Sequence, residues 1–144
     1  MRGMLAIALG LGGCAAGAGG TSGRDWRFAE ARADCAPWDG AATTVLLSDS
    51  PISDSLAGPY LSITVYRSMS EAGGRTRVDG RQADGMAARL CPREGPCLPA
   101  DDGWAELTAG DSTISGRYQL RFADGQKLAG QFSARIGNRR ILCG

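Results

Sequence analysis

Apolar and polar residues alternate with a period of two over much of the chain beyond residue 42, and this period is typical of β-strands. Residues 60–66 alternate cleanly, so Leu61, Ile63 and Val65 are expected to face a core. Residues 43–47 form a β-branched apolar run, and the proline- and glycine-containing segment 48–59 should be the loop between the two strands. Shorter strands are expected at residues 87–91 and 104–108, so β-structure dominates.

The C-terminal third predicts a hairpin with a defined register. Residues 114–122 and 127–136 both carry apolar side chains at even positions. A two-residue turn would put the two apolar sets on opposite faces of the hairpin. A three-residue turn, with Gly125 left-handed, puts both on one face. The expected pairs are then Leu120 with Leu128, Tyr118 with Gly130 and Gly116 with Phe132.

That register also accounts for the two glycines inside the strands, because an aromatic ring from across the pair covers each of them. A second turn at Gly137-Asn138 should lead to a last short strand over residues 139–143. The C-terminus is therefore expected to be an antiparallel meander with one solvent-facing side.

Two segments do not follow the strand pattern. Residues 26–35 are alanine-rich, with Phe28 and Ala31 on one helical face, and predict a short helix. Residues 69–87 contain four glycines and predict a long loop, with a weak hairpin around 76–78. The expected fold class is all-β with one short N-terminal helix: a small antiparallel β-sandwich or barrel of about seven or eight strands.

The first thirteen residues have the composition of a secretory signal: Arg2, an apolar run at 4–11, then small residues. The run is about half of the roughly 20 residues that a spanning helix needs, so a permanent membrane span is not expected. Leu11-Gly12-Gly13-Cys14 resembles the lipobox of bacterial lipoproteins, whose cysteine receives the lipid and becomes the N-terminus after cleavage. An ordinary cleaved signal with an incidental cysteine is the alternative.

The resemblance implies a diacylglyceryl group on Cys14 and a place in the bacterial cell envelope. Ala15 follows the cysteine, where an aspartate retains some enteric lipoproteins at the inner membrane, so the outer membrane facing the periplasm is favoured. We therefore divide the chain into a signal peptide (1–13), a lipidated cysteine with a flexible tether (14–23), and a single disulfide-braced β domain (24–144).

The charge balance excludes a typical nucleic-acid binder. The chain has 16 basic and 15 acidic residues, and removal of the signal takes away only Arg2, so the mature chain is formally neutral.

Four cysteines remain once Cys14 carries lipid, and an even set in an exported chain predicts two disulfides. Of the three possible connectivities we favour Cys35 with Cys143 and Cys91 with Cys97. A zinc site from the same thiols is disfavoured, because the chain has no histidine and no CxxC pair. No metal and no cofactor are expected.

Without histidine, a serine or cysteine triad of the usual kind is excluded. Asp101 and Asp102, with Glu106 and Asp111 nearby, could supply carboxylates for a hydrolase or a cation. Residues 99–103, however, have the composition of a polar turn. We therefore expect a protein that is not an enzyme, and a carboxylate-dependent hydrolase is the least favoured alternative.

The solvent face of the meander carries a candidate patch for an anionic partner, made of Arg117, Arg121, Lys127 and Arg135. The simpler interpretation is a solvated sheet face whose charges deter edge pairing. The loop at residues 73–81 is a second candidate contact surface.

We expect a lipid-anchored envelope protein with a binding or structural role. Its partners would be the membrane, through the anchor, and an envelope protein or an anionic glycan or lipid. An inhibitor of a lysozyme or protease is the alternative. Ser115-Gly116-Arg117-Tyr118 resembles the inhibitory stretch of membrane-bound lysozyme inhibitors, with one residue fewer between the glycine and the tyrosine.

Overall fold

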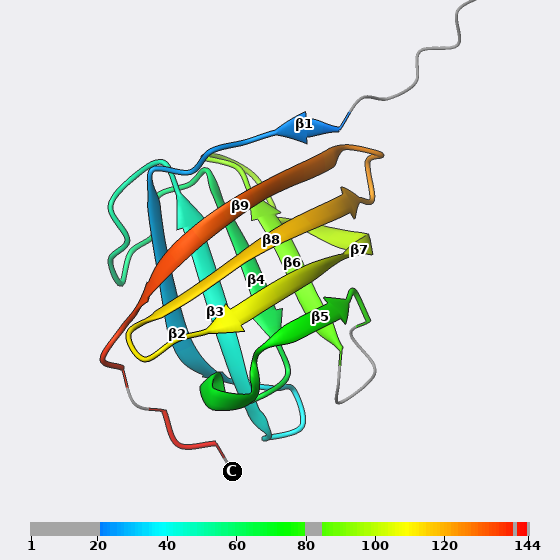
Figure 1. Ribbon diagram of the computed structural model, residues 1–144. Helices are drawn as coiled ribbons and strands as arrows, with labels where there is room; N and C mark the ends of the chain where they lie inside the picture. Colours follow the sequence, from blue (N-terminus) through cyan, green and yellow to red (C-terminus); the bar gives the residue numbers. More distant parts are fainter. Residues whose placement is uncertain (1–20, 80–84, 140, 144) are drawn as a thin grey trace, which may run out of the picture.

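Seven of the nine strands in the described part of the chain close into a barrel. The computed structural model describes residues 21–79, 85–139 and 141–143. Around the barrel the order is β9, β2, β3, β4, β6, β7 and β8, and β8 pairs again with β9 (Figure 1). The bounds of these seven strands are β2 Phe28–Cys35, β3 Ala41–Ser48, β4 Tyr60–Val65, β6 Met86–Cys91, β7 Leu98–Ala109, β8 Thr113–Phe122 and β9 Lys127–Ile136. The fold is therefore all-β, and of the two expected architectures it is the barrel.

Three short elements complete the structure. β1 (Ser22–Gly23) runs parallel to the start of β9, and β5 (Gly74–Arg77) adds to the edge of β7. A single 3-10 turn, η1 (Met69–Glu71), lies between β4 and β5. Within the barrel, the one parallel contact joins β2 to β9, and it closes the ring. No helix in the described ranges is long and apolar enough to cross a membrane.

The core lies inside the barrel, and every barrel strand contributes to it. Leu61, Ile63 and Val65 of β4 are fully buried, as their alternation predicts. β6, β8 and β9 contribute their even-numbered residues, and β2 and β3 their odd-numbered ones. β7 changes from even-numbered to odd-numbered core residues at its irregularity between Ala100 and Asp102. Burial of these side chains is the main force that closes the barrel, because apolar surface removed from water contributes roughly 25 cal/mol per Å².

The predicted hairpin register is confirmed residue by residue. Leu120 pairs with Leu128, and Tyr118 with Gly130. The turn is closed by a hydrogen bond from the Phe122 N–H to the Gln126 carbonyl oxygen and by one from the Gly125 N–H to the Phe122 carbonyl oxygen, and Gly125 has φ of +84°. This left-handed conformation is one that glycine adopts without steric cost.

The two strand glycines lie where large side chains need the room. A Cβ at Gly130 would sit 2.7 Å from the Tyr118 hydroxyl oxygen, and one at Gly116 would sit 3.0 Å from the ring of Phe132. The expected covering of both glycines by aromatic rings is thus confirmed.

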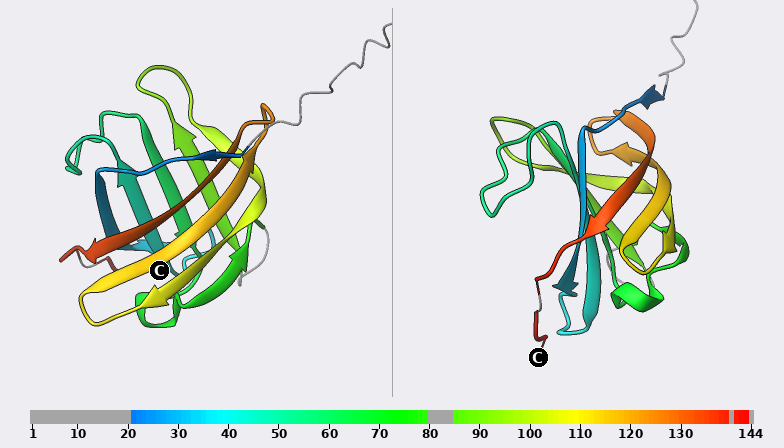
Figure 2. Two further views of the ribbon diagram at one scale, coloured as in Figure 1. Left: turned by 45° about the horizontal axis from the view of Figure 1, so that its top comes forward. Right: turned by 60° about the vertical axis from the view of Figure 1, so that its left-hand side comes forward.

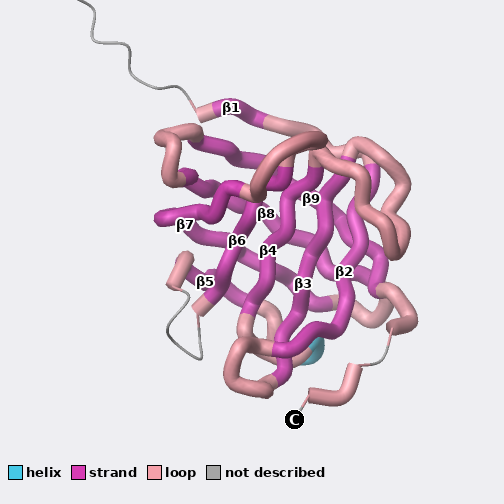
Figure 3. Tube along the Cα trace, turned by 180° about the vertical axis from the view of Figure 1, so that it is seen from behind, coloured by secondary structure: helices cyan, strands magenta, loops and turns pink. Residues whose placement is uncertain are grey.

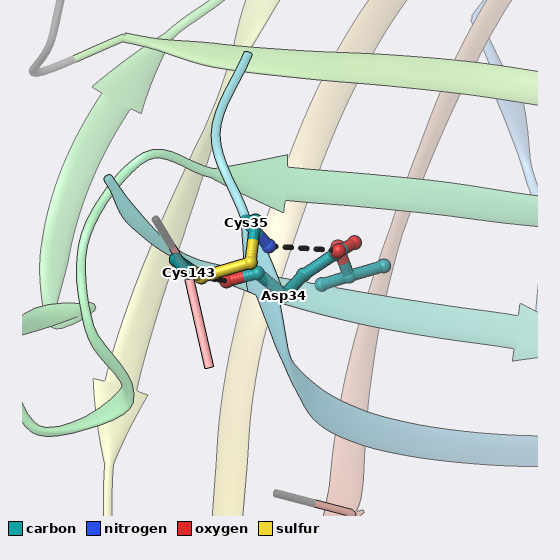
Figure 4. Close-up of a disulfide and its surroundings, with 4 residues drawn as sticks. Asp34, Cys35 and Cys143 are labelled. Atoms are coloured by element: carbon teal, nitrogen blue, oxygen red, sulfur yellow. Dashed lines mark hydrogen bonds between the residues drawn. A yellow bond between two sulfur atoms is a disulfide. The ribbon is translucent and has the colours of Figure 1, made fainter. Parts of the chain in front are cut away.

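Both favoured disulfides are present, Cys35 to Cys143 and Cys91 to Cys97. The first ties the C-terminal tail to the end of β2 (Figure 4). Beside it the Asp34 carboxylate accepts hydrogen bonds from the Cys35 backbone N–H (2.8 Å) and the Thr44 hydroxyl (2.7 Å). The bridge therefore lies in an ordered polar environment.

The outer face of β3 is also covered, which is unusual for a barrel strand. Residues 42–48 are buried on both faces. On the outside, Leu46 lines a hollow together with Leu56 of the β3–β4 loop and Ile141 of the tail. Figure 3 views β2, β3, β4 and β6 from this side.

The prediction of a helix at residues 26–35 is wrong. Residues 28–35 form β2, and all eight of them pair with β3, from Phe28 opposite Ser48 to Cys35 opposite Ala41. A helix there would leave β3 unpaired on one side and the barrel open. The tertiary pairing overrides the helix propensity of the alanines, which is worth only tenths of a kcal/mol per residue.

Other boundaries also differ from expectation. Described residues 139 and 141–143 form no strand, because the tail leaves the barrel to reach Cys35. The expected loop at 69–87 contains η1 and β5, and Val78 bridges to Met86, while residues 80–84 lie outside the described part. The turn expected at 99–103 is instead part of β7, with an irregular register between Ala100 and Asp102.

Candidate functional site

The four cations of the predicted patch all lie exposed on the outer face of β8 and β9, but they do not form one free cluster. Arg117 donates a hydrogen bond of 2.9 Å to Glu106 on β7. Arg121 donates one of 3.0 Å to Asp101 and lies 3.9 Å from Asp102. Lys127 sits opposite Arg121, whereas Arg135 sits at the far end of β9, opposite Thr113. The charges of Arg117 and Arg121 are thus partly offset.

Three of the four carboxylates considered for chemistry have arginine partners, and the fourth, Asp111, is exposed between β7 and β8. Asp101 and Asp102 are both held by Arg121, while Glu106 is held by Arg117 and Arg75. Within the described ranges no group of three or more metal-ligating side chains converges. The clustering of Asp101, Asp102 and Glu106 in the sequence, which suggested a chemical site, is explained by their ion pairs with arginines on neighbouring strands.

Glu106 is the centre of an ordered group around Trp104. It accepts hydrogen bonds from Arg75 at 3.1 Å and from Arg117 at 2.9 Å. Both guanidinium groups also lie over the Trp104 ring, at 4.2 Å for Arg75 and 5.7 Å for Arg117. We call these four residues, Arg75, Trp104, Glu106 and Arg117, the Trp104 surface.

The electrostatics of the Trp104 surface follow from its geometry. The hydrogen bond from Arg117, with a smaller contribution from Arg75, lowers the pKa of Glu106 below its ordinary value. At neutral pH the group therefore carries two cations and one carboxylate. A guanidinium stacked on an indole gains cation–π energy and is held in place.

Trp104 was missed in the sequence, whereas Arg75 belongs to residues 73–81, the second candidate contact surface, but was not singled out there. Trp104 lies in a run where Ala105 and Leu107 point inward, so the alternation itself places the tryptophan outside. Arg75 lies in a segment taken for a loop. Only the pairing of β5 with β7, which sets Arg75 opposite Glu106, brings the two arginines to the same ring.

The stretch that resembles a lysozyme-inhibitor motif, Ser115 to Tyr118, lies in the middle of β8. Tyr118 points into the barrel, is 2% exposed, and accepts a hydrogen bond from Trp26 Nε1. Burial raises the pKa of Tyr118. The tyrosine is part of the core and is not presented to a partner.

No family model, no curated protein and no solved structure matches this chain.

Proposed function

We propose that this protein is a lipid-anchored component of the bacterial envelope whose barrel binds another envelope protein through the Trp104 surface. The lipobox at residues 11–14 supports the anchor. The two disulfides support export, because disulfides persist in oxidising compartments. Ala15 supports placement at the outer membrane, facing the periplasm.

The observation that carries the binding role is the position of Trp104. Trp104 is half-buried on the outer face of β7 and is not part of the hydrophobic core, whereas its neighbours Ala105 and Leu107 are. Tryptophan and arginine are the residues most enriched among the energetic centres of protein interfaces. Here they are stacked and hydrogen-bonded before any partner arrives, which reduces the entropy lost on binding.

The anchor is tested by replacing the cysteine. Cys14→Ala is expected to abolish incorporation of labelled fatty acid and to release the protein from the membrane fraction. The barrel should be unaffected, because every described strand lies after residue 21. If the variant still takes up labelled fatty acid, the proposed lipidation is wrong.

The binding surface is tested with a photo-crosslinking residue at Gln119, which pairs with Trp104 across β7 and β8 and is exposed. In intact cells we expect a discrete crosslinked protein. The matched control carries the same residue at exposed Arg89 on β6, on the other side of the barrel. The product should be absent from the Arg89 control and lost in a Trp104→Ala background. Equal products from both positions would contradict the assignment of the surface.

A further inference from the structure

A second feature of the outer face lies beside the Trp104 surface, at the end of the barrel where the chain enters β1. It is a hollow of about 330 Å³ lined by three cations, Arg77, Arg121 and Lys127, and by one carboxylate, Asp102, together with Trp104 and Thr21. We call the three cations the cationic corner. The ends of β5 and β8 and the start of β9 bring them together on one side of the barrel (Figure 1).

Within the described part of the chain, two of these three cations have no carboxylate partner. Arg121 is bound to Asp101 and lies near Asp102. Among the ion pairs of the described residues, none includes Arg77 or Lys127. Lys127 also lies directly opposite Arg121, an arrangement of like charges that is unfavourable in a sheet. An anion bound in the hollow would reduce the repulsion between Lys127 and Arg121.

The position of Thr21 relates the corner to the membrane. Thr21 lines the hollow, and the next residue, Ser22, is fixed beside Leu128 by β1. Both views of Figure 2 show β1 next to the β8–β9 turn. Six residues lie between Cys14 and Thr21, so even a fully extended chain spans only about 25 Å over these seven residue steps. A lipid on Cys14 therefore holds this end of the barrel within that distance of the bilayer surface.

We propose that the cationic corner binds the phosphate of an anionic phospholipid headgroup in the membrane that carries the anchor. This inference rests on the proposed lipidation of Cys14. Guanidinium groups bind phosphate oxygens in a bidentate manner, and an ammonium group adds a further donor.

Binding there would orient the barrel. The β8–β9 turn would face the bilayer, and β7 would run away from it, from Asp102 toward Thr108. Arg75 and Glu106 lie on the distal side of Trp104 and would remain free for a protein partner. The lipid contact and the Trp104 surface are therefore compatible.

The test uses the chain from residue 14 onward with Cys14→Ser, which contains every described strand and cannot carry an acyl chain. Co-sedimentation is measured with vesicles of phosphatidylcholine alone and with added phosphatidylglycerol. We expect binding only to the anionic vesicles, weakening with salt. Because a basic residue near an anionic surface contributes about fivefold in binding, Lys127→Gln and Arg77→Gln should each weaken binding about fivefold.

The matched control is Arg135→Gln, which removes an exposed cation from the same strand as Lys127 but from its opposite end. It should leave vesicle binding unchanged. Equal binding to both kinds of vesicle, or an equal loss in the Arg135 variant, would overturn the proposal. Inorganic phosphate, titrated by NMR, should not saturate the corner. If inorganic phosphate saturates the corner and the protein does not prefer anionic vesicles, the ligand is a soluble phosphate compound and the lipid assignment is wrong.

A negative result in the vesicle experiment can be distinguished from an absence of lipidation at Cys14. The Cys14→Ser chain reports on the corner alone, whereas fatty-acid labelling of the wild-type chain reports on lipidation alone. Circular dichroism of each variant checks that the barrel is intact, which is expected because all three substituted residues are exposed.

Discussion

Trp26 Nε1 donates a hydrogen bond of 2.9 Å to the hydroxyl oxygen of Tyr118, although the two residues are 92 positions apart in the sequence. Trp26 precedes β2, and Tyr118 is in the middle of β8. Arg24 stacks on the Trp26 ring at 3.9 Å and also pairs with Asp49. The bond thus attaches the segment between β1 and β2 to β8, across the intervening strand β9.

Trp26→Phe should destabilise the barrel by about 1 kcal/mol, because it keeps an aromatic ring but removes the donor to a buried hydroxyl. Tyr118→Phe should cost a similar amount. In the double variant the losses should be less than additive, since either substitution alone breaks the bond. Urea denaturation of the four proteins measures this coupling, and strict additivity would show that the bond contributes nothing.

Gly130→Ala should destabilise the protein by about 1–3 kcal/mol, as expected for an overpacked site. The new Cβ would lie 2.7 Å from the Tyr118 hydroxyl oxygen and 2.8 Å from the Arg24 carbonyl oxygen. The same substitution in a Tyr118→Phe background should cost less, because one of the two close contacts is gone.

Gly125→Ala is the comparison for Gly130→Ala. It meets no neighbouring atom but must adopt a positive φ, which costs about 1 kcal/mol. This smaller loss should be independent of Tyr118. Thermal or urea unfolding of these variants separates the steric cost at Gly130 from the backbone cost at Gly125. If the loss of stability in Gly125→Ala changes in a Tyr118→Phe background, this account is contradicted.

The two disulfides should differ in their effect on stability. Cys35 and Cys143 are 108 positions apart, and Cys91 and Cys97 only six. Chain entropy predicts a loss of about 5 kcal/mol when the long loop is opened by a double substitution to alanine, and about 2 kcal/mol for the short one. Urea unfolding under oxidising conditions measures both. Equal losses would show that the long loop is already constrained in the unfolded chain.

The pKa of Glu106 should rise toward its ordinary value in Arg117→Gln, and by less in Arg75→Gln, because Arg117 is the larger cause of the shift. An NMR pH titration of the Glu106 side chain measures this order. Since the folded pKa is lowered, the ion pairs contribute stability at neutral pH and lose it as the pH falls through that pKa. The stability difference between wild type and Glu106→Gln should therefore shrink in acid. A difference that stays constant with pH would contradict the assignment.

Local features of the sequence determined the β8–β9 hairpin and favoured the cysteine pairing. The hairpin register follows from two facts that are visible within some twenty residues: strand side chains alternate, and Gly125 permits a three-residue turn. The favoured pairing of Cys35 with Cys143 and of Cys91 with Cys97 is one of three connectivities that four cysteines allow, and the structure has that pairing. These features depend on neighbours along the chain or on chemistry that needs no fold.

The tertiary structure decided the features that depend on distant partners. Residues 28–35 are a strand only because β3 and β9 offer them partners, and the weak helix preference of their alanines cannot compete with a full row of backbone hydrogen bonds. The same holds for Asp101, which becomes part of an ion pair only when β7 and β8 align it with Arg121. Trp104 and Arg75 meet for the same reason. Alternation along a strand determines which face a side chain occupies, whereas its neighbours across the sheet are set by the closure of the barrel.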